Sequence, residues 1–298
     1  MTAAPALTHG LSFDIEEAHH ALNMWSVTPP ESWEQQPTRV AAVTDRILAM
    51  LAEHQQLATF FVLGKVARRT PEVVHAIVQA GHELASHGSS HRMAGDLGPE
   101  GFAADIADAR ALLQDLSGQP VEGFRASTFS IGRGTRWGLE SVAAAGHTWD
   151  SSVFPVVHDR YGDADFPHTP VHVDLPSGRA LREYPLLTRP AFGKRWPAAG
   201  GGYLRLLPLT LVEGALKRSA REGQPAVVYL HPWELDAEQP RHKLGGLRTF
   251  RHYFGLQRVE GKLRALMGRH SFGPIGEIAV PESARVDPSA LPGGMQVA

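Results

Sequence analysis

The sequence has 298 residues, a formal net charge of −2 and no cysteine. Without cysteine the protein has no disulfide bond, thiolate metal ligand or cysteine nucleophile, so catalysis would depend on histidine and carboxylate side chains. The low net charge predicts no attraction to nucleic acid or to an anionic membrane. Residues 1–9 lack the basic and apolar regions of a leader, and no apolar run is long enough to span a bilayer, so we expect a soluble cytoplasmic protein.

The first half of the chain alternates strand and helix patterns, which is typical of a parallel sheet or a β/α barrel. Apolar residues at positions 40, 43, 47 and 51 recur at helical spacing, and Thr38 before them is a predicted N-cap. The predicted strands are 11–15, 58–63, 84–86 and 121–124, and the other predicted helices are 71–80 and 99–116.

The second half continues the alternation with longer loops. Residues 155–178 are rich in Pro, Gly, Asp and His, which predicts an irregular insertion. We expect one domain over 1–298, with a core at about 9–280, an elaboration at 182–251 and a loose tail at 281–298. The predicted helices are 135–145, 208–222 and 255–267, and the predicted strands are 148–150, 226–230 and 275–280.

Two pairs of residues suggest a metal site. His87 and His91 lie four residues apart, which on a helical turn places both imidazoles within reach of one ion. Asp14 and Glu16 lie two residues apart on a predicted strand, so both face the same way and Ile15 faces away. One carboxylate can bind the metal ion while the other accepts a proton.

Other reactive side chains also stand where predicted strands end. They are Arg125, Asp150 and His231. Because the carboxyl ends of parallel strands meet at one rim of a barrel, where catalytic groups gather, we expect these residues and the two pairs to lie at one site.

Six further motifs keep a fixed order from about residue 10 to residue 280. They are TFFVLG at 59–64, GHELASH at 81–87, GFRA at 123–126, WDSS at 149–152, GGGY at 200–203 and LHPWE at 230–234. With the histidine pair, this series resembles the polysaccharide deacetylases of carbohydrate esterase family 4, which share the nodulation-protein deacetylase homology domain. Within that family, the chain is most similar to the branch associated with exosortase-type exopolysaccharide systems.

The resemblance implies an α/β fold, a distorted β/α barrel with about seven parallel strands and an elaborated C-terminal part. It also implies a divalent metal ion, usually Zn²⁺, bound by Glu16, His87 and His91. Asp14 would be the general base that takes a proton from the attacking water.

The resemblance implies roles for four more residues. His231 would protonate the departing amine, Arg125 would orient the general base, and Asp150 would set the tautomer and pKa of His231. A backbone N–H near Thr128 would bind the oxyanion. Two departures from the family pattern stand out: Ile15 separates two acids that are commonly adjacent aspartates, and Ser127 replaces a proline, which predicts a looser oxyanion loop.

These observations predict hydrolysis of N-acetyl groups from an N-acetylhexosamine polymer or its precursor. Two alternatives stay open: an amidohydrolase of a small N-acyl or ureide metabolite, and a carbohydrate-binding relative without turnover. The expected partner is a carbohydrate, not nucleic acid, and the oligomeric state is not predicted. The predicted sugar-contacting residues, which include aromatic side chains able to stack on pyranose faces, are Trp25, Arg160, Tyr203 and Trp233.

Overall fold

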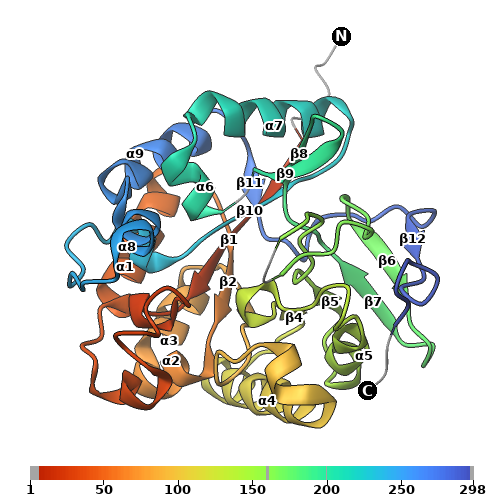
Figure 1. Ribbon diagram of the computed structural model, residues 1–298, viewed down its shortest axis with the longest axis horizontal. Helices are drawn as coiled ribbons and strands as arrows, with labels where there is room; N and C mark the ends of the chain where they lie inside the picture. The colour runs from red at the N-terminus through yellow and green to blue at the C-terminus, as the bar shows by residue number, and fades with distance from the viewer. Residues whose placement is uncertain (1–6, 159–160, 199, 296–298) are drawn as a thin grey trace.

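The computed structural model describes residues 7–158, 161–198 and 200–295, and its centre is a mostly parallel sheet (Figure 1). The parallel strands are β1 (His9–Ile15), β2 (Thr59–Val62), β3 (Glu83–Ser86), β4 (Gly123–Phe124), β5 (Trp149–Asp150), β7 (Ala180–Glu183) and β10 (Val227–Leu230). They lie in the order β10-β1-β2-β3-β4-β5-β7, each parallel to its neighbour. Every residue of β1 is buried, because it is an interior strand covered on both faces.

One contact connects the two ends of this row of parallel strands. The chain just after β7 forms an isolated parallel bridge between Leu186 and Val227, and the N–H of Leu187 donates to the carbonyl oxygen of Val227 at 3.0 Å. Among the described residues this is the one point at which the sheet closes, and the arrangement confirms the predicted distorted barrel with about seven parallel strands.

Further strands extend the sheet. β6 (Val171–Asp174) pairs antiparallel with β7, β12 (Arg285–Val286) pairs with β6, and β11 (Phe272–Gly273) pairs with β1. β8 (Thr188–Ala191) and β9 (Lys194–Pro197) form a separate hairpin.

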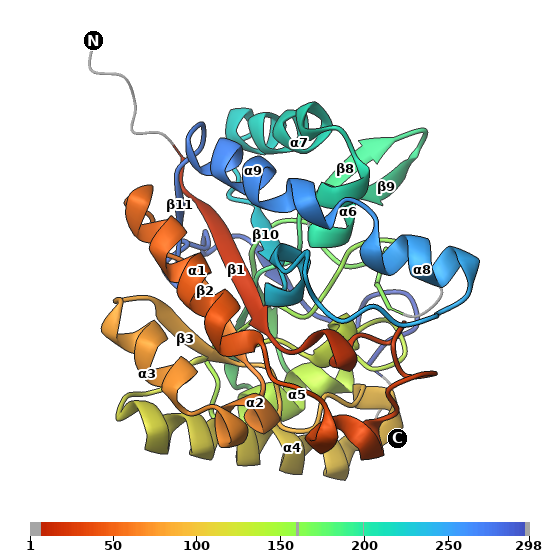
Figure 2. The same ribbon diagram turned by 90° about the vertical axis from the view of Figure 1, so that its left-hand side faces the viewer.

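Helices surround the sheet (Figures 1 and 2). They are α1 (Val40–Glu53), α2 (Gly64–Arg69), α3 (Glu72–Gln79), α4 (Ala94–Ser117), α5 (Trp137–Ala144), α6 (Gly201–Leu206), α7 (Leu209–Arg221), α8 (Gly246–Tyr253) and α9 (Leu256–Met267). The apolar positions that predicted α1, including Val43 and Ile47, are buried in the core beside β1. No helix within the described residues is both long and apolar enough to cross a bilayer.

The start of α1 differs from the prediction. Thr38 is not the N-cap; that position is Arg39, whose own side chain makes no cap hydrogen bond. Instead, the carboxylate of Glu17 accepts the N–H groups of Arg39 at 2.8 Å and Val40 at 3.0 Å and the hydroxyl of Thr38 at 2.6 Å. Glu17 is therefore a helix cap from a distant part of the chain.

The C-terminal region also differs from the prediction. Residues 275–280 do not form a strand, and β6 lies inside the region 155–178 that was expected to be irregular. The tail beyond 281 is not loose over its described part, because β12 joins the sheet and Arg136 donates to the carbonyl oxygens of Pro292 (3.0 Å) and Gly294 (3.3 Å). Short-range sequence patterns do not reveal these long-range contacts.

Candidate active site

His87 and His91 lie in the loop between β3 and α4, not on a helical turn as predicted. Gly88 (φ +72°) and His91 (φ +58°) have left-handed backbone conformations, which turn the loop sharply. The carboxylate of Asp105 accepts the N–H of Ser89 at 2.7 Å and supports this turn. The two imidazoles therefore converge through loop geometry rather than helical spacing.

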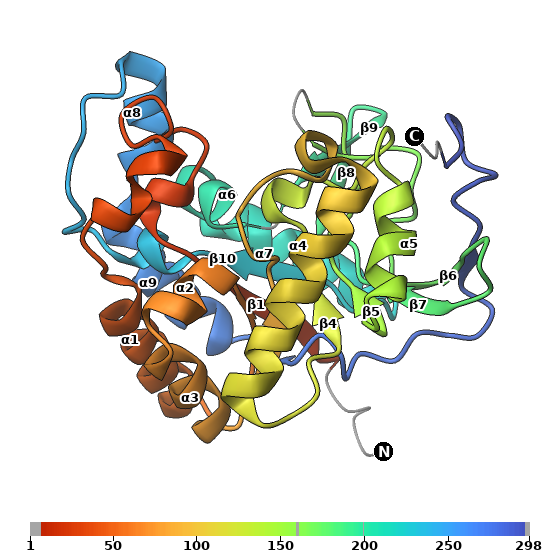
Figure 3. The ribbon, with the colours of Figure 1, turned by 90° about the horizontal axis from the view of Figure 1, so that it is seen from below.

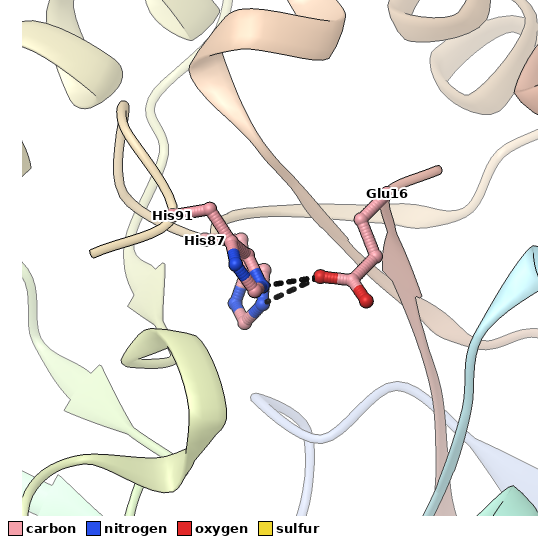
Figure 4. A group of neighbouring side chains, drawn as sticks. All are labelled: Glu16, His87 and His91. Atoms are coloured by element: carbon pink, nitrogen blue, oxygen red, sulfur yellow. Dashed lines mark ion pairs between the residues drawn. The ribbon is translucent and has the colours of Figure 1, made fainter. Parts of the chain in front are cut away.

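Glu16 completes a group of three side chains (Figure 4). Its Oε2 atom lies 2.5 Å from Nε2 of His91 and 3.9 Å from Nε2 of His87. All three side chains are buried, with at most 4% of any of them exposed. One carboxylate and two imidazoles form a common ligand set for a divalent metal ion.

The hydrogen bonding of His87 shows that this group suits a cation. Its Nδ1 donates to the carbonyl oxygen of Arg125 at 2.9 Å, because a carbonyl oxygen can only accept. Burial lowers the pKa of His87 to about 4, so at neutral pH the ring is neutral and Nε2 carries a lone pair. That lone pair faces the carboxylate of Glu16, and two buried acceptors are costly to hold together unless a cation lies between them.

Arg125 is fully buried and fixes the position of Asp14. Its Nη1 atom donates to Oδ1 of Asp14 at 2.7 Å and to the hydroxyl of Ser12 at 2.8 Å. Its Nε and Nη2 atoms donate to the carbonyl (3.0 Å) and hydroxyl (2.8 Å) of Ser151, and its guanidinium lies 3.9 Å from the ring centre of Phe61. These contacts hold Asp14 in one orientation beside the group of Glu16, His87 and His91.

His231 follows β10 and enters the same site. Its Nε2 atom lies 3.9 Å from Oδ2 of Asp14 and 3.7 Å from Oε1 of Glu16. Its Nδ1 atom donates to Oε2 of Glu234 at 3.1 Å, and Arg205 donates to the other oxygen of Glu234 at 3.2 Å. Burial alone would lower the pKa of His231, but the charge of Glu16 and the hydrogen bond to Glu234 outweigh it and raise the pKa to about 9.

Asp150 has different partners from those predicted, since Glu234 and not Asp150 contacts Nδ1 of His231. The Asp150 carboxylate accepts the hydroxyl (2.6 Å) and N–H (3.2 Å) of Ser152, whose hydroxyl oxygen accepts the N–H of Ala126 at 2.7 Å. The predicted role of Asp150 in setting His231 is therefore wrong. Asp150 instead supports the loop that follows Arg125.

A second buried carboxyl, Glu183, faces Asp150. Burial raises the pKa of Asp150, and burial together with the charge of Asp150 raises the pKa of Glu183 well above its usual range. Oε1 of Glu183 accepts the N–H of Val153 at 2.9 Å. The raised pKa of Glu183 favours its protonated form, because two buried like charges repel strongly.

A cleft of about 450 Å³ is lined by part of the predicted site, whereas Arg125 and Asp150 are fully buried and outside its lining. Among the residues predicted for the site, its lining includes Asp14, Glu16, His87, His91, Thr128, Tyr203, His231 and Trp233. Trp25 is outside the lining: its indole N–H donates to the carbonyl oxygen of His20 at 2.9 Å, and Ala21–Asn23 line the cleft instead. Arg160, the remaining predicted sugar contact, lies outside the described residues.

The loop containing Ser127 and Thr128 is tightly turned. Thr128 (φ +58°) and Phe129 (φ +52°) adopt left-handed conformations that are uncommon for residues other than glycine. The hydroxyl of Ser127 donates to the carbonyl oxygen of His87 at 3.2 Å. The serine that replaces the family proline therefore adds a tether between the predicted oxyanion loop and a metal-ligand loop.

Gly200 and Gly201 are sites of close approach between the backbone and other side chains. A Cβ atom on Gly201 would lie 1.7 Å from Oε2 of Glu234, and one on Gly200 would lie 2.5 Å from the ring of Tyr229. A Cβ atom on Gly202 would meet its nearest neighbour at 3.8 Å. Gly201, the first residue of α6, leaves space for the carboxylate that contacts His231.

Sequence reasoning missed Glu234 as a site residue, although a local signal existed. Glu234 stands three residues after His231 and also accepts the N–H of His231 at 3.1 Å, which is a capping-box arrangement. Arg205 and Ser12 had no such signal, because they come from distant segments.

Two family models match successive parts of this chain. Residues 31–148 match the model described as polysaccharide deacetylase, and residues 151–280 match the domain of unknown function DUF3473. The barrel and the buried Glu–His–His group are consistent with that class of protein. Residues 31–148 thus form a polysaccharide deacetylase domain, of the kind found in carbohydrate esterase family 4, and DUF3473 follows it over residues 151–280.

Named relatives match short parts of the chain. The chitooligosaccharide deacetylase of Sinorhizobium fredii is 44% identical over 48 residues, which are 16% of this chain and 22% of the relative. A peptidoglycan-N-acetylglucosamine deacetylase of Bacillus cereus is 28% identical over 78 residues, which are 26% of this chain and 37% of the relative. The matched part is thus less than two thirds of either relative.

Solved structures share the fold over most of the chain. A candidate polysaccharide deacetylase from Mycobacterium smegmatis has a TM-score of 0.61 and 17% identity, covering 89% of this chain and 85% of that one. The Puue allantoinase has a TM-score of 0.59 and 14% identity, covering 89% and 86%. At these identities the similarity shows the fold alone.

Proposed function

We propose that the protein is a metal-dependent hydrolase that removes acetyl groups from an N-acetylhexosamine unit of a polysaccharide or its precursor. The observation that carries this proposal is the convergence in one cleft of three potential metal ligands with a carboxylate and an imidazole. Nε2 of His231 lies 3.9 Å from Asp14 and 3.7 Å from Glu16. One acetamido group is therefore able to contact the imidazole and the carboxylates at the same time.

Glu16, His87 and His91 would hold the metal ion, which we propose to be Zn²⁺ from the donor set. When bound, the ion supplies Lewis-acid polarisation of the substrate carbonyl and a water molecule of lowered pKa. The tautomer of His87 is set by the carbonyl of Arg125, so its Nε2 is free to bind metal.

The remaining residues would move protons and position groups. Asp14, oriented by Arg125, takes the proton of the attacking water as the new C–O bond forms. The backbone N–H near Thr128 donates to the oxyanion. His231 gives its proton to the amine nitrogen as the C–N bond breaks, so that acetate and a free amine leave. Glu234 acts as a positioning residue by holding Nδ1 of His231.

The cleft lining supports a sugar substrate. Tyr203 lines it with a partly exposed ring, and aromatic faces stack on pyranose rings. Trp233 also lines it, but its ring is 8% exposed and stacks on His252 and His231, so Tyr203 is the better-placed sugar contact. The indole N–H of Trp233 donates to Oε1 of Glu16 at 3.3 Å, so Trp233 helps to position one of the proposed metal ligands. The roles in exopolysaccharide synthesis and the cytoplasmic location stay predictions from the sequence.

A second candidate is hydrolysis of a small ureide or N-acyl amide. The fold by itself does not separate it from the deacetylase, because the Puue allantoinase and the Mycobacterium smegmatis protein share the fold with TM-scores of 0.59 and 0.61. Both reactions would use the same proton-transfer groups. They differ in whether the substrate is a sugar.

The test is acetate release from N-acetylglucosamine oligomers by zinc-loaded protein whose metal content is measured. We expect release that stops with chelator and returns with Zn²⁺, and His231→Ala should lose activity while keeping the metal. Activity on allantoin without acetate release from any acetylated sugar would reject the deacetylase in favour of the second candidate. Oligomer binding without turnover would instead support a carbohydrate-binding relative.

A further inference from the structure

Helix α8 presents large apolar side chains to solvent. Leu247 is 64% exposed, Phe250 is 47% exposed and Phe254, just after the helix, is 39% exposed. Spacings of three and four residues place these side chains along one face of a helix. The Phe250 and Phe254 rings contact each other with their centres 4.6 Å apart. Together, Leu247, Phe250 and Phe254 form what we call the α8 apolar face.

The chain around this face is strongly basic. Between 241 and 258 there are five Arg and Lys residues and no Asp or Glu. All five are exposed, and none of them forms an ion pair with another residue in the part of the chain that the structure describes. They are Arg241, Lys243, Arg248, Arg251 and Arg258.

The α8 apolar face lies at the edge of the molecule and beside the cleft. Figures 2 and 3 both show α8 at the periphery. Arg205 anchors its C-terminal end by donating to the carbonyl oxygens of His252 (2.7 Å) and Phe254 (3.3 Å). Arg251 of α8 and Leu206, which is 44% exposed at the end of α6, also line the cleft.

We propose that the α8 apolar face and its basic surroundings bind the surface of an anionic lipid bilayer. Exposed apolar side chains on a short helix surrounded by cationic side chains are the pattern of an interfacial anchor. The cations complement anionic headgroups, while Leu247, Phe250 and Phe254 enter the apolar boundary below them. A polyanion in solution would explain the charge but not the exposed phenyl rings.

The low net charge predicted no attraction to an anionic membrane, but charge is unevenly distributed along the chain. The value of −2 is summed over the whole chain and conceals a local cluster of positive charge. Binding at the α8 apolar face would hold the edge of the cleft against the bilayer, where a substrate carried on a lipid is within reach. The inference stands independently of the proposed reaction, because neither Phe250 nor Arg248 lines the cleft.

Flotation of the full chain with vesicles tests the proposal. We expect binding to vesicles of equal parts phosphatidylglycerol and phosphatidylcholine, and little binding to pure phosphatidylcholine. Phe250→Ser and Arg248→Glu should each reduce the bound fraction by about tenfold or more at moderate salt. Circular dichroism and acetate release from a soluble oligomer should match the wild type.

Matched controls come from elsewhere on the surface. Phe192 is 96% exposed in the β8–β9 hairpin, and Arg221 is exposed at the end of α7, so Phe192→Ser and Arg221→Glu should bind vesicles like the wild type. Three results would overturn the proposal: no binding to anionic vesicles, equal loss in the control variants, or retention on a soluble anionic polysaccharide without vesicle binding.

Discussion

Oε2 of Glu234 accepts a hydrogen bond from Nδ1 of His231 at 3.1 Å and another from the backbone N–H of the same histidine at 3.1 Å. Arg205 donates to the second carboxylate oxygen at 3.2 Å. The carboxylate of Glu234 thus holds both the imidazole and the backbone N–H of His231, which stands three residues before it. This arrangement aims Nε2 at Asp14 and Glu16.

Glu234→Gln should lower kcat by roughly 10- to 100-fold with little change in KM or metal content. The amide preserves the shape but not the charge that holds the His231 ring. The measurement is steady-state acetate release together with elemental analysis. Glu234→Asp, which keeps the charge on a shorter side chain, should recover part of kcat. If Glu234→Gln leaves kcat unchanged, Glu234 does not act through His231.

Asp14→Asn should keep the metal and lose about 10²- to 10⁴-fold in kcat, because the amide cannot accept the proton of the attacking water. Glu16→Gln should lose metal, because it removes the negative ligand of the group. Zinc content of the two purified variants separates the roles. Metal loss in Asp14→Asn with retention in Glu16→Gln would exchange the base and the ligand.

Gly201→Ala should impair activity although it adds only a methyl group. The new Cβ would lie 1.7 Å from Oε2 of Glu234, so that carboxylate must move away from His231. Overpacking of this kind destabilises a protein by about 1–3 kcal/mol, which thermal unfolding measures. Gly214→Ala in α7 is the control, because a Cβ atom there would meet nothing within 4 Å and Gly214 is outside the cleft lining, so kcat should match the wild type.

The free energy of unfolding should depend on pH through the buried carboxyl groups of Asp150 and Glu183. Burial, then the charge of Asp150, raises the pKa of folded Glu183 well above its value in the unfolded chain. The stabilising contribution is therefore full below the unfolded pKa of about 4.3 and is lost as pH rises toward the folded pKa. Glu183→Gln removes this titration.

Unfolding of Glu183→Gln and the wild type should be compared at several pH values. The difference in Tm should shift in favour of the variant as pH increases from about 5 to about 8. Glu260→Gln is the control, because Glu260 is a surface residue whose partners are Arg46 and Arg264. A Tm difference that is constant with pH would show that Glu183 has no raised pKa in the folded state.

Local sequence patterns predicted much of the fold. Strands β2 and β10 are short apolar runs, and α1 shows its buried face as a periodic series, because both patterns depend on neighbours within one element. β6 and β12 were missed, because short strands at the edge of a sheet depend on pairing with distant residues.

The sequence by itself determined the reactive residue types and the strand ends that carry them. The spacing of Asp14 and Glu16 predicted both carboxylates on one side, and both lie within 3.9 Å of Nε2 of His231 although β1 ends at Ile15. The spacing of His87 and His91 was not sufficient to predict how their side chains converge, because two residues with left-handed backbone conformations in a loop produce this convergence. Only the tertiary structure decided which carboxylate accepts the hydrogen bond from His231. Asp150 and Glu234 are equivalent as acids, but in the folded chain Asp150 contacts Ser152 and Glu234 contacts His231.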